Sequence, residues 1–140
     1  MSIFNEEERK GYNEQSIFVG ALLGGPLVAG YMMAENYKAV GKDENVMLTW
    51  VFALAYVVFQ IIGHDLHSII GLPRIAVAFI SAFIIILIAK AVQGNEIYQL
   101  KMEDDRIHGW GRTAVISIIG MILVFTIFFL IELFFIVILG

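Results

Sequence analysis

The chain has 140 residues, of which 59% are hydrophobic and only 16% charged, and this balance excludes a water-soluble globular domain. A formal net charge of −4 offers no basic surface to a polyanion, so nucleic acid is excluded as a partner. The absence of cysteine excludes disulfides, thiolate metal sites and cysteine nucleophiles.

Four apolar segments are long enough to cross a bilayer as helices. Charge-free runs of 20 residues occupy 15–34 and 45–64, and each covers the roughly 30 Å of a hydrocarbon core. The third run, 75–89, reaches that length when Arg74 and Lys90 extend to the two interfaces. The sequence therefore predicts an all-α polytopic membrane protein, a four-transmembrane-helix bundle, with a polar tail at 1–15, a single domain at 16–140 and spans at about 16–33, 46–63, 73–93 and 113–138.

Lysine and arginine counts predict the orientation of these spans. The loops at 34–45 and 93–112, counted together with Lys90 at the end of the third apolar run, carry six basic residues, whereas the N-terminal tail, the middle loop and the C-terminus carry three. The positive-inside rule then places both of these loops in the cytoplasm and both termini outside.

The first apolar segment combines a small-residue stripe with a helix breaker. Small residues four apart allow another helix to approach closely, and proline removes an amide that the helix needs. We expect close packing and a kink in this segment, although a break at membrane depth can also expose carbonyls to an ion. The residues concerned are Gly20, Gly24, Gly25 and Pro26.

The third apolar segment offers a matching surface of small side chains, at Ala78, Ser81 and Ala82. This match predicts that the first and third helices are close neighbours. Beyond it, Ile97, Leu100 and Ile107 fall near one helical face of the loop at 93–112, which predicts a short interfacial helix. Trp110 and Arg112 would anchor the start of the last helix at headgroup level.

Few residues could carry chemistry. His64, Asp65 and His67 form an H-D-x-H cluster that is a weak candidate metal site, and loop polarity explains it as well. Glu132 is the one carboxylate inside a long apolar run, and such a residue needs a polar partner. We expect an intramembrane polar cluster, within one chain or between subunits, made of Glu132, Arg74, Gln60, His64 and His67.

Several short motifs resemble those of a group of small four-span bacterial inner-membrane proteins without an assigned function. The first is a G-(G/S)-P-L-x-A-G…N-(Y/F)-x-A-x-G signature, matched here by Gly24, Gly25, Pro26, Leu27, Ala29, Gly30, Asn36, Tyr37, Ala39 and Gly41. Further similarities are Ile75 to Ala78, Ala89-Lys90, Gln93-Gly94 and Trp110. The resemblance implies a bacterial cytoplasmic membrane location and implies no activity.

The sequence favours a non-enzymatic accessory or interaction subunit of a membrane complex, because no cofactor motif or catalytic arrangement is evident. The expected partners are the lipid bilayer and either a second copy of the chain or another membrane protein. The alternative is a homo-oligomeric channel or transporter that uses the Gly24-Gly25-Pro26 break and Glu132. A metal-dependent membrane enzyme that uses His64, Asp65, His67 and Glu132 is the third reading.

Overall fold

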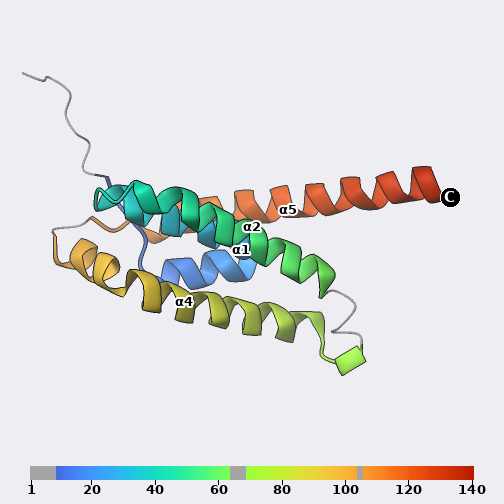
Figure 1. Cartoon of the computed structure of the whole chain (residues 1–140), viewed down its shortest axis with the longest axis horizontal. Helices are drawn as coiled ribbons and strands as arrows, with labels where there is room; N and C mark the ends of the chain where they lie inside the picture. The colour runs from blue at the N-terminus through green and yellow to red at the C-terminus, as the bar shows by residue number, and fades with distance from the viewer. Residues whose placement is uncertain (1–8, 64–68, 104–105) are drawn as a thin grey trace, which may run out of the picture.

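The computed structural model describes residues 9–63, 69–103 and 106–140, and Figure 1 shows their helices. These helices are α1 (Glu14–Ala39), α2 (Glu44–Ile62), α4 (Arg74–Met102) and α5 (Trp110–Leu139). Each of the four is long and apolar enough to cross a membrane. The predicted all-α class is therefore confirmed, and the four helices indicate a multi-pass membrane protein.

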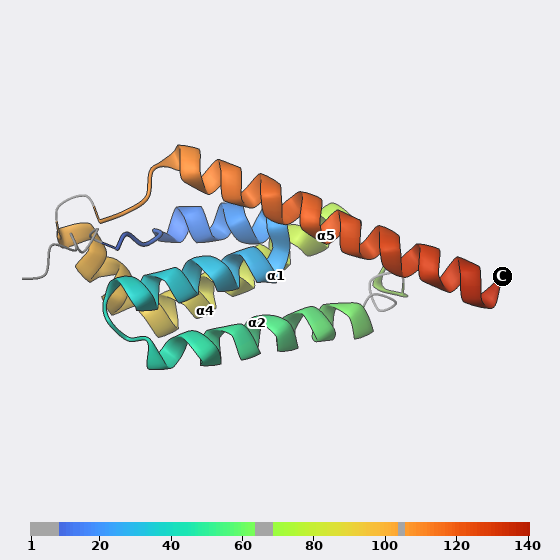
Figure 2. The same cartoon turned by 90° about the horizontal axis from the view of Figure 1, so that it is seen from above.

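Helix α1 is folded back on itself at Gly25. The backbone there has φ 70° and ψ −164°, a conformation outside the helical range. The first arm (residues 14–24) and the second arm (residues 26–39) run side by side in opposite directions, as Figure 2 shows. Tyr12 before the first arm thus meets Asn36 near the end of the second. We call this pair of arms the hairpin.

The local sequence explains the reversal. Gly25 adopts a positive φ that residues with a Cβ rarely adopt, and Pro26 begins the second arm at a position where its missing N–H costs nothing. Small residues let the arms approach, since a Cβ at Gly20 would lie 2.8 Å from the Met32 sulfur. The arms are about 16 and 21 Å long, so neither covers a 30 Å core alone. Although α1 has the length and composition of a span, the span predicted at 16–33 is therefore not one continuous crossing helix.

The hairpin changes which parts of the chain share one end of the molecule. Both ends of α1 lie together, so residues 9–13, 40–43, 103 and 106–109 gather at what we call the polar end (Figure 2). Gly11 accepts a hydrogen bond from the His108 amide and donates one to the Arg106 carbonyl. The prediction that the N-terminal tail lies opposite the loops at 34–45 and 93–112 is therefore wrong for residues 9–13 of that tail. The C-terminus lies at the other end of the molecule.

The hairpin is the centre of the molecule, and the other three helices pack around it. Helix α1 contacts α2, α4 and α5, which confirms that the first and third predicted helices are neighbours. Ala82 and Ala89 of α4 are buried against it. The outer faces of α2, α4 and α5 are apolar and exposed. In both views α5 extends well beyond α2 and α4 (Figures 1 and 2).

The predicted interfacial helix does not form, because α4 continues without a break to Met102. The apolar face that suggested it is buried within the protein. Ile97 and Leu100 are fully buried, and Leu100 lies against Gly11. The N-terminal segment (residues 9–13) and the hairpin therefore cover the apolar face of α4 that the sequence placed at the membrane interface.

Candidate functional site

The predicted packing and kink residues lie at the tip of the hairpin and beside it. Gly24 contacts Val28 of the second arm, and a Cβ on Gly24 would lie 3.5 Å from the carbonyl oxygen of Ser117 in α5. Gly120 of α5 approaches the same point. The chain reverses direction at Gly25, where the sequence predicted a bend, and Gly24 packs closely between the second arm and α5.

Two buried carboxamides fasten the polar end of the hairpin. The Asn36 Oδ1 accepts from the Tyr12 amide at 2.5 Å, and Asn36 Nδ2 donates to the Tyr12 carbonyl at 3.0 Å. The same Nδ2 group lies 3.3 Å from Gln93 Oε1, while Gln93 Nε2 donates to the Met33 carbonyl at 2.7 Å. Asn36 and Gln93 are both fully buried. We call this arrangement the carboxamide clamp; it joins the N-terminal segment, the second arm and α4.

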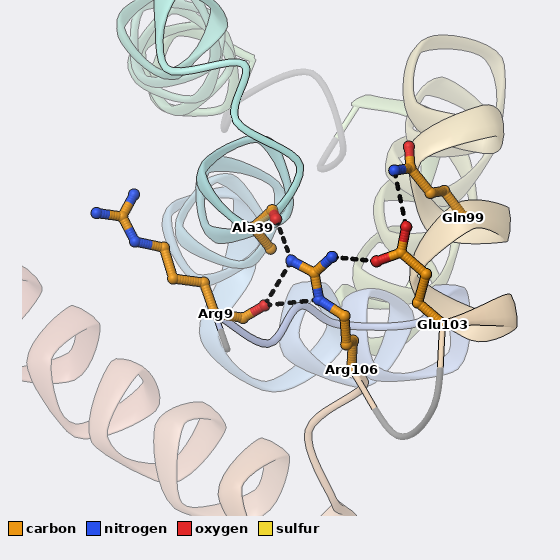
Figure 3. Close-up of polar contacts among 5 residues, drawn as sticks. All are labelled: Arg9, Ala39, Gln99, Glu103 and Arg106. Carbon is orange, nitrogen blue, oxygen red and sulfur yellow. Dashed lines mark hydrogen bonds and ion pairs between the residues drawn. The ribbon is translucent and has the colours of Figure 1, made fainter. Parts of the chain in front are cut away.

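Arg106 makes a second junction at the polar end, shown in Figure 3. Its guanidinium donates to the carbonyl oxygens of Arg9 and Ala39 and to the carboxylate of Glu103. Hydrogen bonds from Gln99 and then Arg106 lower the pKa of Glu103. One side chain thus joins the N-terminal segment to the ends of α1 and α4.

Four further ion pairs lie at or near this end. Lys42 contacts Glu96 at 2.6 Å, and this hydrogen bond raises the pKa of Lys42. The Glu96 side chain is only 9% exposed, so it depends on this partner more than surface carboxylates do. The other three pairs are Lys101–Glu14 at 2.6 Å, Lys38–Glu35 at 2.9 Å and Arg9–Asp43 at 3.8 Å.

The predicted interface anchors behave differently from each other. Trp110 is 55% exposed at the start of α5, where a headgroup layer would lie. Arg112 turns instead to the fully buried Tyr12, and its Nε donates to the Tyr12 hydroxyl at 3.1 Å. Burial raises the pKa of Tyr12. The His108 ring packs against Tyr12 at a tilt of 45°, with 4.7 Å between centroids.

The predicted intramembrane polar cluster is not assembled within the described part of the chain. Gln60 donates to Ser81 at 2.8 Å, and Tyr56 lies 3.1 Å from the same hydroxyl, so these groups join α2 to α4. Glu132 is exposed on α5 and has no polar contact among the described residues. Its pairing with Arg74 across a subunit boundary stays a prediction. His64 and His67 lie outside the described residues.

A cavity of about 260 Å³ lies between α2 and α4, with the second arm of the hairpin as its floor. Its walls are almost entirely apolar, and it runs from Pro26 towards Tyr37 and Asn45 at the polar end. The sequence predicted neither this cavity, nor the carboxamide clamp, nor the Arg106 contacts, because each is formed by residues far apart along the chain.

No group of three or more His, Asp or Glu side chains within residues 9–63, 69–103 and 106–140 could hold a metal ion. The weak metal candidates His64, Asp65 and His67 lie outside those ranges. In comparisons with known proteins, the chain matches no family model, no curated protein and no solved structure.

Proposed function

We propose that the protein is a non-enzymatic accessory or interaction subunit of a membrane complex, located in a bacterial cytoplasmic membrane. The observation that carries the proposal is the packing of α5. Its buried residues, Thr113 and Ser117, both lie near its start, where α5 contacts the hairpin. The remaining length is apolar and exposed, and it is available to helices of another chain.

The charges at the polar end support an orientation with this end in the cytoplasm. Because the N-terminal segment lies there, Arg9 and Lys10 join Lys38, Lys42, Lys101, Arg106 and Arg112 of the two loops. Seven basic residues at the polar end then compare with Arg74 alone at the opposite end. This ratio is stronger than the sequence indicated, and it favours a cytoplasmic N-terminus and an outside C-terminus.

The length of α5 supports a specific depth for Glu132. Glu132 follows Arg112 by 20 residues, which is about 30 Å along a helix. If Arg112 lies at the cytoplasmic interface, Glu132 reaches the outer interface, where a carboxylate costs far less than at the midplane. The residues after Glu132 then extend past the bundle and add to the surface that a partner can contact.

A channel or transporter is less well supported by the same geometry. The hairpin tip touches Gly120, and Glu132 lies 12 residues further along α5, about 18 Å away. The two features therefore do not meet in one chain. The arms of the hairpin also pack directly on each other, so no path for an ion runs between them at the Gly-Gly-Pro break.

The test is to extract the complex from membranes with a lipid-preserving polymer and to measure its mass. A second, stoichiometric chain is the expected result. Because the chain has no cysteine, Phe129→Cys on α5 gives a unique crosslinking position, with Phe52→Cys on exposed α2 as the matched control. We expect the partner to crosslink through position 129 and not through 52. A lone 15.7 kDa chain, or a homo-oligomer that conducts ions in liposomes, would overturn the proposal.

A further inference from the structure

Arg112 has a hydroxyl partner where other basic residues of the polar end have carboxylates. Its Nε donates to the Tyr12 hydroxyl at 3.1 Å, and Tyr31 lies near it. In the part of the chain that the structure describes, no carboxylate pairs with Arg112. By contrast, five basic side chains around it do have such a partner: Arg9, Lys38, Lys42, Lys101 and Arg106.

One further basic side chain lies near Arg112. The His108 ring packs on Tyr12 with 4.7 Å between centroids, and both Arg112 and Lys10 lie close enough to His108 to add to the effect of burial in lowering its pKa. The carboxylate that opposes this effect on His108 is Glu35, and Lys38 contacts it at 2.9 Å. The first turn of α5 contains no acidic residue. Among the described residues, neither Arg112 nor Lys10 therefore forms an ion pair with a carboxylate.

The start of α5 carries side chains typical of a membrane interface. Trp110 is exposed one turn before Thr113, and tryptophan gathers at the boundary between hydrocarbon and water. Arg112 and Lys10 are exposed, whereas Tyr12, whose hydroxyl accepts from Arg112 Nε, is fully buried. With the polar end at a headgroup layer, the exposed guanidinium would meet lipid headgroups.

We propose that Arg112 and Lys10, with Tyr12 as a positioning residue, form a binding site for the phosphate group of an anionic phospholipid. A guanidinium matches two phosphate oxygens at once, and the Tyr12 hydroxyl holds its Nε while its remaining N–H groups can donate. Basic pockets beside membrane helices bind anionic headgroups on the cytoplasmic side. The site needs the polar end at a headgroup layer, and it is independent of any partner at α5.

The test measures lipid binding to the purified full-length chain in detergent by native mass spectrometry. Phosphatidylglycerol and phosphatidylcholine are titrated separately, and we expect the anionic lipid to bind about fivefold more tightly or better. Arg112→Gln should remove this preference. Arg9→Gln is the matched control, because it removes one positive charge from the same end while its side chain pairs elsewhere, with Asp43.

Lys10→Gln keeps the test valid if Arg112→Gln fails to fold, since Lys10 is exposed; it should also reduce the preference severalfold. A wild-type preference that survives excess inorganic phosphate supports a lipid headgroup as the ligand. Equal losses in Arg9→Gln and Arg112→Gln would overturn the site, because they would show a diffuse charge effect. If the chain binds inorganic phosphate but shows no preference between the two lipids, the proposal that the bound phosphate belongs to a lipid headgroup is overturned.

Discussion

At the scale of single residues, Asn36 has the largest structural role relative to its size. Its carboxamide satisfies both backbone groups of Tyr12 and contacts Gln93 as well. A buried polar group without a partner loses its hydration and gains nothing in return. The clamp therefore stabilises the fold mainly because its removal leaves several buried groups unpaired.

Replacing Asn36 with alanine should lower the free energy of unfolding by about 3 kcal/mol, because the Tyr12 amide and carbonyl both lose their partner. Denaturant unfolding in detergent measures the change. Asn95→Ala is the matched control, since Asn95 is exposed on α4 and should shift stability by less than about 0.5 kcal/mol. Equal stability of the two variants would show that the clamp contributes nothing.

At the scale of elements, the fold depends on the reversal within α1. Hydropathy identified the apolar residues of α1 correctly, yet it cannot distinguish one crossing helix from two shorter arms of the same composition. The Gly-Gly-Pro break was visible in the sequence, but its angle depends on the φ of Gly25, which no pattern reports. The sequence ended the third helix too early for a related reason. Leu100 is covered by Gly11, which lies far away in the chain, so its burial could not be predicted from the local pattern.

Gly25→Ala tests this element. A Cβ meets no atom there, but the positive φ imposes backbone strain of about 1–3 kcal/mol, so stability should fall. Gly94→Ala is the control, because Gly94 lies within α4 with open space around it and the substitution should raise stability by about 0.5–1 kcal/mol. Thermal unfolding of both variants gives the comparison. A Gly25→Ala protein as stable as the wild type would contradict a reversal that requires glycine.

At the scale of the whole molecule, the sequence predicted the helical class, the proximity of the first and third helices and the start of each helix within three residues, but not the ends of α1 and α4. It did not predict the carboxamide clamp, because single Asn and Gln residues 57 positions apart carry no pairing signal. Nor did the sequence predict that the N-terminal segment lies beside the two loops. Successive loops lie on alternate sides of a membrane only when every apolar segment between them crosses it.

Cysteine labelling in intact cells tests the arrangement of the ends. Lys10→Cys and Lys42→Cys should both be protected from an impermeant thiol reagent, and Gly140→Cys should react, because the first two positions share the polar end. If the first apolar segment crossed the membrane, position 10 would instead react together with position 140. Labelling before and after permeabilisation separates these patterns.

The carboxamide clamp also sets an order for the assembly of the chain. Tyr12 and Asn36 are made early, but Gln93 of the clamp follows Tyr12 by 81 residues, and Arg106, which contacts Arg9 and Ala39, follows it by 94. With the polar end in the cytoplasm, as we propose, both ends of the hairpin lie on the side where the chain is synthesised. The N-terminal segment is then the first part of the described chain to be synthesised and among the last to be fastened, once α4 has returned to that side.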